Sequence, residues 1–240
     1  MTSILTNNGA MVALQTLSSV NNDLTESQNQ ISTGKKVGSA SDNAAVWAIS
    51  KTMESDVAGF EAISESLAVG EATVSVASAG AEQIVEKLTE IKELIVSAQS
   101  ENVDHAKLEA DVDELKNQIT SVIGASQFNG ANLLNDTVDG TESSLGVLAS
   151  LDRVGAGGTV TAVEISIDAV GFESSLDLAT NLTEITDTAT ASSALDQIED
   201  FLQTAITGAA ALGADAARLD DQSKFVSELV DSMTMGVSTM

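Results

Sequence analysis

The residue types that could support catalysis or metal binding are few and far apart in this sequence. His105 is the single histidine and there is no cysteine, so disulfides and thiolate metal sites are excluded. No second histidine stands near His105, and nothing in the sequence positions a Ser-His-Asp triad around it. We therefore predict that His105 lies at the surface and that the protein has no catalytic residue, no metal and no cofactor.

Other polar groupings lack the spacing of a functional site. Two acidic groups could suggest cation binding: Asp111/Asp113/Glu114 and Asp220/Asp221. Neither has the glycine and ligand order of a calcium loop, so we interpret both as solvated helix faces. The glycines at 155–158 are not followed by Lys-Ser/Thr, which argues against a phosphate loop. Trp47 stands near the start of a long apolar pattern, which favours packing over ligand stacking.

The charge of the chain excludes several partners. Thirty-six acidic and ten basic residues give a net charge of −26, which disfavours binding to nucleic acid and to anionic membrane surfaces. No apolar run reaches the roughly 18 residues of a membrane helix, so no membrane insertion is expected. The N-terminus lacks the basic and apolar regions of a general secretory signal. Export from the cell would need another route, and self-assembly would have to overcome repulsion by burying apolar surface.

The elements that would carry these residues are long helices. Apolar residues make up 43% of the chain and aromatic residues only 2%, so small aliphatic side chains must form the core. Over 42–99, steps of four and three residues meet apolar side chains almost throughout, broken only by Asp56 and Gly70: Ala45, Ile49, Met53, Phe60, Ile63, Leu67, Val74, Ala77, Ala81, Ile84, Leu88, Ile91, Ile95 and Ala98. This heptad pattern predicts coiled-coil packing along a helix about 85 Å long.

Three more helices and a β region complete the expected order. Residues 1–33 carry an apolar stripe (Met11, Leu14, Leu17, Leu24 and Ile31), and 34–41 form a hinge, with Ser41 or Asp42 capping the next helix. A helix at 105–123 is expected to be capped by Asn102 or Asp104 and ended by Gly124. Residues 159–168 alternate as a strand does. A second heptad pattern occupies 192–240, capped by Ser192 or Ser193.

The predicted fold class is mainly α with a small β part. We expect an elongated rod of long antiparallel helices in coiled-coil packing, plus a short β-hairpin region. The segments are an N-terminal inner helix and hinge (1–41), the N-terminal part of a rod-like core (42–135), a short β and turn region (136–191) and the C-terminal core helix (192–240).

Four stretches, in this order, carry a family resemblance. They are QISTGKKV at 30–37, SASDNAA at 39–45, LTEIKELIVSA at 88–98 and SQFNG at 126–130, the last followed by Leu133 and Leu134. Together with the helical ends they resemble the bacterial flagellins. Asn43 and Val46 depart from the family's commoner Asp and Gly.

The resemblance implies a structural role in the bacterial flagellum. Flagellins leave the cell by type III export, meet an export chaperone and a filament cap, and polymerise into the extracellular filament that drives motility. The family ends with a C-terminal inner helix of about forty residues that this sequence lacks, and the heptad pattern still runs at Met240. We therefore expect a truncated chain whose 1–33 helix lacks its partner and which does not polymerise alone.

The resemblance also nominates contact residues. The family's stretch matching 88–98 is a subunit contact and a docking site for an innate immune receptor. The outward candidates are Thr89, Glu90, Lys92, Glu93 and Leu94, and the matching turn motif is Gln127, Phe128, Asn129 and Gly130. Glu90 stands where receptor-active flagellins carry arginine, which predicts a weak receptor ligand. A hook–filament junction protein and a rod-like secreted adhesin or binding module are the alternatives.

Overall fold

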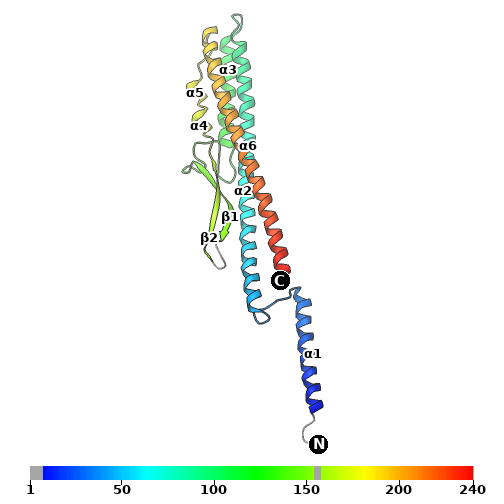
Figure 1. The fold of residues 1–240 in the computed structure, drawn as a ribbon. Helices are drawn as coiled ribbons and strands as arrows, with labels where there is room; N and C mark the ends of the chain where they lie inside the picture. The colour runs from blue at the N-terminus through cyan, green and yellow to red at the C-terminus, as the bar shows by residue number, and fades with distance from the viewer. Residues whose placement is uncertain (1–7, 154–157, 240) are drawn as a thin grey trace. The chain divides into compact units, whose positions relative to one another are not determined.

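The computed structural model describes residues 8–153 and 158–239 of the chain (Figure 1). The chain divides into two compact units, Met1–Glu61 with Glu228–Met240, and Ala62–Ser227. The fold is mainly α, with long helices and one two-stranded antiparallel sheet, as the sequence predicts. Within the described residues, no helix combines the length and the apolar character needed to cross a membrane.

The first unit contains helix α1 (Asn8–Thr33) and the hinge. All members of the predicted apolar stripe on α1 are exposed. The helix ends at Gly34, whose φ of +66° is a left-handed conformation that glycine adopts without a steric penalty.

The hinge is organised by one aspartate. The Asp42 carboxylate accepts hydrogen bonds from the backbone N–H groups of Ser39 at 2.9 Å and Gly38 at 3.1 Å. These bonds, chiefly the one from Ser39, lower the pKa of Asp42. The next helix, α2 (Ala44–Ser97), is capped instead by Asn43, whose Oδ1 accepts from the N–H of Val46 at 3.2 Å. The predicted cap at Ser41 or Asp42 is therefore wrong, because Asp42 is already bound to the hinge backbone.

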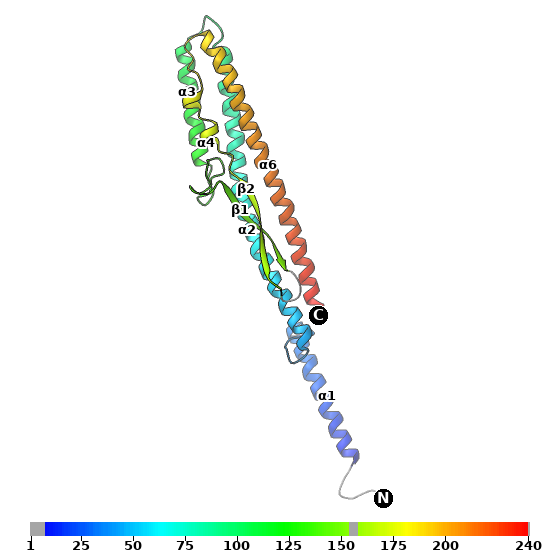
Figure 2. The same ribbon diagram turned by 60° about the vertical axis from the view of Figure 1, so that its left-hand side comes forward.

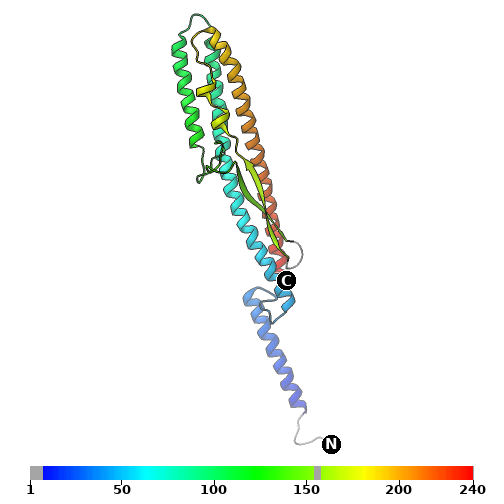
Figure 3. The ribbon, with the colours of Figure 1, turned by 90° about the vertical axis from the view of Figure 1, so that its left-hand side faces the viewer.

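The second unit is an elongated helical bundle. Residues 62–97 of α2 lie beside α3 (His105–Ala125) and beside the part of α6 (Thr188–Ser238) that belongs to this unit. A short turn folds α3 back antiparallel to α2, and α6 is also antiparallel to α2 (Figure 2). Figure 3 shows the same arrangement from a third direction.

The predicted seam of α2 forms the core of the bundle. From Phe60 to Ala98, every seam position is buried, Gly70 included. The predicted seam begins nearer the N-terminus of α2 than the buried residues do, since Ala45 is exposed and Ile49 is 53% exposed. On α6, the heptad positions of the predicted 192–240 pattern, counted in alternating steps of three and four from Leu195, are all buried or half-buried where described. Ile198, Ala205, Leu212, Leu219 and Val226 are fully buried.

The ends of α3 and α6 only partly follow the sequence predictions. Asp104 caps α3 as predicted, with its carboxylate accepting from the N–H of Lys107 at 3.2 Å. Gly124 does not end the helix, which continues to Ala125. Helix α6 begins four residues before the predicted cap: the carboxylate of Asp187 accepts from the N–H of Thr190 at 2.8 Å, a contact that leads the causes lowering the pKa of Asp187.

A β-hairpin packs on the helices. Strand β1 (Ser144–Arg153) pairs antiparallel with β2 (Val160–Asp168), which confirms the predicted hairpin and the strand at 159–168. A bulge interrupts the pairing between Leu148 and Ser150. Gln222 of α6 donates from Nε2 to the carbonyl of Ala149 at 2.8 Å. The carbonyl group of the bulge residue therefore has a hydrogen-bond donor from a helix side chain. Gly155 and Gly157 lie outside the described residues.

Two short helices connect the hairpin to α6. These are α4 (Phe172–Ser175) and α5 (Leu178–Asn181), and Phe172 and Leu178 are buried. A Cβ at Gly208 of α6 would collide with the ring of Phe172, so that glycine permits the close approach.

Candidate subunit-contact surface

The nominated stretch on α2 has one buried face and one outer face. Leu88, Ile91 and Ile95 are completely buried, as predicted for the seam. Thr89, Glu90 and Glu93 are exposed. Lys92 and Leu94 are half-buried, so their side chains lie at the border between core and solvent.

Two ion pairs organise this outer face. Lys87 Nζ lies 2.8 Å from Oε1 of Glu90, one turn along α2. Lys92 Nζ lies 2.5 Å from Oε1 of Glu199, which stands on α6. The sequence patterns did not predict this second pair, because it depends on the alignment of two helices that are far apart in the chain. Lys92 therefore joins α2 to α6, and Glu90 remains accessible to a partner.

The second nominated site is a tight β-turn. The N–H of Phe128 donates to the carbonyl of Ala131 at 2.9 Å, and the reverse bond is 3.0 Å. Asn129 and Gly130 between them have φ values of +50° and +87°. Positive φ at both central residues defines a type I′ turn, for which Asn-Gly is a preferred pair. Gln127 and Phe128 are exposed beside it.

The turn is held against the helices by residues that the sequence patterns did not nominate. Asn132 is buried; its Nδ2 donates to the carbonyl of Ile123 at 2.7 Å and its Oδ1 accepts from the N–H of Leu134 at 2.9 Å. Gly80 of α2 faces Ser126, and a Cβ at this position would overlap the Ser126 hydroxyl. The available signal was a glycine in the interior of a predicted helix, which often marks a close approach of another segment.

The two nominated sites lie at different levels of the bundle. A groove beside the turn is lined by Phe128 and Asn129 together with Ser66, Val69 and Thr73 of α2. The stretch 89–94 contacts α6 instead, through Lys92. The structure therefore presents two separate surfaces and not one combined site.

His105 has a structural contact that corrects the surface assignment. It is half-buried, and its Nε2 lies 2.8 Å from the carbonyl oxygen of Ala98, just after the last turn of α2. The carbonyls at a helix C-terminus lack intrahelical donors, so an imidazole N–H satisfies one of them.

The buried carboxylate of Glu109 was also not predicted. It accepts from Nζ of Lys116 at 3.1 Å and from the backbone N–H of Ile185 at 2.7 Å, which ties α3 to the segment before α6. Both acidic groups considered as cation sites are exposed on α3 and α6. The described residues contain no group of three or more side chains suited to hold a metal ion.

Together these features define a helical structural protein, in which the ordered polar groups cap helices, join helices and fix a turn. Comparisons with known proteins identify the class further. Residues 4–139 match the model of the bacterial flagellin N-terminal helical region. The chain is 36% identical over 243 aligned residues to flagellin FljM of Caulobacter vibrioides, covering all of this chain and 84% of that protein. It is 39% identical over 198 residues to flagellin A of Rhizobium meliloti, covering 79% of this chain and 50% of that one.

The chain belongs to the bacterial flagellin family and is a subunit of the flagellar filament. Solved structures share the fold. The crystal structure of Bacillus cereus flagellin aligns with a TM-score of 0.55 at 20% identity, covering 66% of this chain and 86% of that one. A protein described as a flagellar hook-associated protein from Vibrio parahaemolyticus aligns with a TM-score of 0.57 at 15% identity, covering 84% and 100%. The fold is thus common to both flagellar classes, and the sequence relatives assign this chain to the flagellins.

Proposed function

We propose that the protein acts along the whole filament as a purely structural subunit and catalyses nothing. The observation that carries this proposal is the core itself. One buried seam runs along α2 from Phe60 to Ile95 and ends at Ala98, just after the helix. The polar contacts described above cap helices or join them. Such a bundle offers its outer surface to neighbouring subunits.

The proposal extends to export and partners. The subunit leaves the cell through the flagellar type III apparatus, with a chaperone before export and a cap at the growing tip. Segment 1–41 then forms the inner helix and hinge, 42–135 and 192–240 form the rod-like core, and 136–191 forms the short outer region. The exposed stripe on α1 supports the first assignment, because an isolated amphipathic helix gains most of its stability from a packing partner.

Immunogold electron microscopy separates the candidate roles. A strain lacking the gene should lose filaments or carry altered ones, and an epitope-tagged copy should be labelled along the entire filament. Labelling confined to the junction between hook and filament would instead identify a junction protein. Labelling of the cell surface in cells with normal filaments would identify an adhesin.

We also propose that Glu90 makes the free subunit a weak ligand of the innate immune receptor that binds flagellins. Glu90 is exposed, and Lys87 already partly neutralises its carboxylate. A receptor pocket built around an arginine would lose the forked donor and meet an acceptor of opposite charge. Loss of one partner of a buried charged pair costs about 2–5 kcal/mol, so binding should be weaker by at least about tenfold.

The test is a receptor-reporter assay on monomeric protein. Glu90→Arg should raise signalling markedly, and the matched variant Glu86→Arg, on the same helix, should not. Unmodified protein that signals as strongly as an arginine-bearing flagellin would contradict the proposal.

A further inference from the structure

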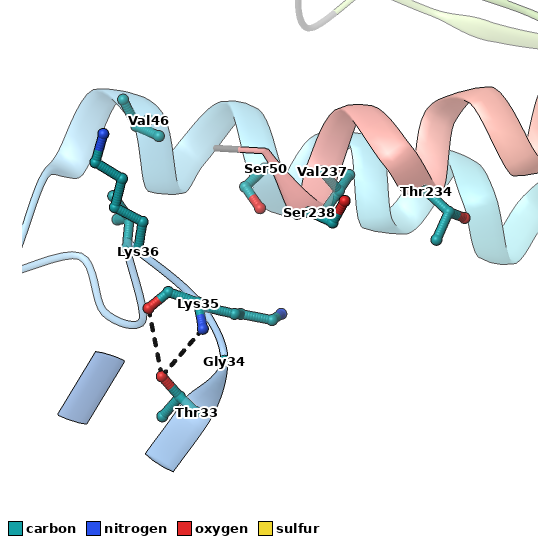
Figure 4. Close-up of a pocket in the computed structure, with 10 residues that line it drawn as sticks. Thr33, Gly34, Lys35, Lys36, Val46, Ser50, Thr234, Val237 and Ser238 are labelled. Atoms are coloured by element: carbon teal, nitrogen blue, oxygen red, sulfur yellow. Dashed lines mark hydrogen bonds between the residues drawn. The ribbon is translucent and has the colours of Figure 1, made fainter. Parts of the chain in front are cut away.

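The second unit carries a groove that is lined without charged residues. In the first unit, the cavity of about 270 Å³ at the hinge is lined by Lys35 and Lys36 as well as by valines (Figure 4). The groove beside the tight turn differs, because every described residue that lines it is uncharged. Its volume is about 160 Å³. A cavity of about 150 Å³ is large enough to hold benzene, so one branched aliphatic side chain can enter this groove.

Two exposed apolar side chains border the groove. Val69 of α2 is 52% exposed, and Phe128 of the turn is 37% exposed. The hydroxyl groups beside them are bound within the chain. Ser66 Oγ accepts from the N–H of Leu148 at 3.3 Å. Thr73 donates from Oγ1 to the carbonyl of Val69 at 2.9 Å. The groove therefore offers apolar surface that a single copy leaves exposed.

A matching apolar side chain stands on α6. Residues 201–214 include no charged side chain, and this is the longest such run on α2, α3 or α6. Ile206 lies within the run and is 44% exposed, and the residues three and four positions from it are all uncharged. The other exposed large apolar side chains on the described part of α6 are Phe225 and Met235, and each has an aspartate four residues before it. Ile206 is thus the exposed apolar side chain of α6 with neutral surroundings on its own helix.

The groove and Ile206 lie on different sides of the second unit. Residues 145–147 of β1 line the groove, which places it on the side where the hairpin packs. Thr204 of α6 lies on that side too, since it lines another groove together with residues 168–170, directly after β2. Ile206 is two residues from Thr204, a rotation of about 200° around the helix, so it points away from that side. One copy can therefore use its groove and its Ile206 at the same time.

We propose that Ile206 of one copy inserts into the groove bordered by Val69 and Phe128 of the next copy in the filament. Each copy has a net charge of −26, so two copies repel each other wherever exposed carboxylates meet, and these two uncharged surfaces approach without that repulsion. The contact is heterologous, because the groove of one copy meets a different surface of its neighbour, and such contacts repeat into open helical polymers. The inference rests on the filament role, which brings copies into contact.

Disulfide trapping tests this contact, because the chain has no cysteine of its own. Val69→Cys and Ile206→Cys proteins are added in equal amounts to seeds of native filaments and then oxidised. Mass spectrometry should find the peptide containing position 69 joined to the peptide containing position 206, and neither variant should form dimers alone. Filaments that incorporate both variants without this link overturn the inference. Dimers of either variant alone also overturn it, by identifying a symmetric contact. Unmodified protein that does not join the seeds overturns it together with the filament role.

Charged variants provide an independent readout. Ile206→Glu should raise the critical concentration for addition to these seeds at least about tenfold, as expected of a covered apolar anchor. Val69→Lys in the same chain should recover much of that loss, because the introduced lysine meets the introduced carboxylate of the neighbouring copy.

Val96→Lys is the matched control for the recovery. Val96 is 50% exposed on the same helix, and its substitution changes the net charge equally. All three side chains are exposed, so thermal unfolding of the monomer should stay unaltered. An Ile206→Glu protein that joins the seeds as the unmodified protein does overturns the inference. Recovery by Val69→Lys that is no greater than recovery by Val96→Lys overturns it as well.

Discussion

At the residue scale, Asn132 is the side chain on which the tight turn most depends. Its amide satisfies the carbonyl of Ile123 and the N–H of Leu134 in a buried setting. Asn132→Ala leaves both backbone groups unpaired, and each buried unpaired group costs about 1–3 kcal/mol. We expect a fall of about 2–6 kcal/mol in the free energy of unfolding by urea denaturation. The exposed Asn117→Ala on α3 is the matched control, and equal effects of the two variants would contradict the assigned role.

The conformation of the turn gives a second residue prediction. Gly130 has a φ of +87°, and a Cβ added there would meet no atom within 4 Å, so a substitution is limited by the backbone alone. Gly130→Ala should destabilise by about 1 kcal/mol, the usual cost of a left-handed alanine. Gly124→Ala, also in open space but inside a helix at negative φ, should be neutral or stabilising. If thermal unfolding showed Gly124→Ala to be less stable than Gly130→Ala, the type I′ assignment would be wrong.

Single polar residues were the hardest features to predict from sequence. Asp104 could be assigned as a cap because it stands directly before a helical pattern, and the structure agrees. Asn132 and Glu109 could not be assigned, because their partners are backbone groups brought near by the fold. Asp42 was assigned wrongly as the cap of α2. Its carboxylate could accept either from the first turn of α2 or from the hinge backbone, and in the structure it accepts from the hinge N–H groups.

At the element scale, the α2 seam should supply much of the stability of the second unit. Leu67 and Ile84 are completely buried, so Leu67→Ala or Ile84→Ala should cost about 2–5 kcal/mol each. Val69→Ala, on the exposed face of the same helix, should change the free energy of unfolding by less than about 0.5 kcal/mol. Leu67→Asp should be worse than Leu67→Ala, and unchanged thermal unfolding of Leu67→Asp would refute the seam.

The helices and strands show which features of the fold can be predicted from the sequence. The heptad pattern predicted the buried face of α2 from Phe60 to Ala98, since a helix with one apolar stripe has one way to bury it. The same pattern wrongly included Ile49, because periodicity reports a face and not whether a partner covers it. Strand β1 was not delimited, since its position depends on Val147 packing against Gly70 and on a bulge completed by Gln222.

The hinge element should respond to acid in a defined window. Hydrogen bonds from Lys35 first and then Lys51 hold the pKa of Glu54 at about 2, below its ordinary value of 4.5. Because the folded pKa is the lower one, this contact contributes fully above about pH 4.5 and is lost as the pH falls from 4.5 toward 2. Carboxyl NMR should show Glu54 titrating near 2, and Lys35→Gln should move that pKa upward. Titration of Glu54 near 4.5 in the unmodified protein would contradict the contact.

At the scale of the whole molecule, electrostatic repulsion between copies opposes assembly. A net charge of −26 favours the dispersed monomer, and most basic side chains are already paired within their own copy. We therefore expect contacts between copies to come chiefly from apolar and neutral surface.

This balance predicts the direction in which salt acts on assembly. At about 0.1 M ionic strength the Debye length is about 10 Å, so repulsion between exposed carboxylates of neighbouring copies is largely screened. Raising NaCl from about 10 to 150 mM should therefore lower the critical concentration for addition of the protein to seeds of native filaments, as measured by light scattering. Lys107→Glu, which adds acidic charge away from the hinge, should raise the critical concentration at low salt and lose that effect at high salt. A critical concentration that increases with salt in the unmodified protein would mean that attraction between charges, and not burial of neutral surface, holds the filament together.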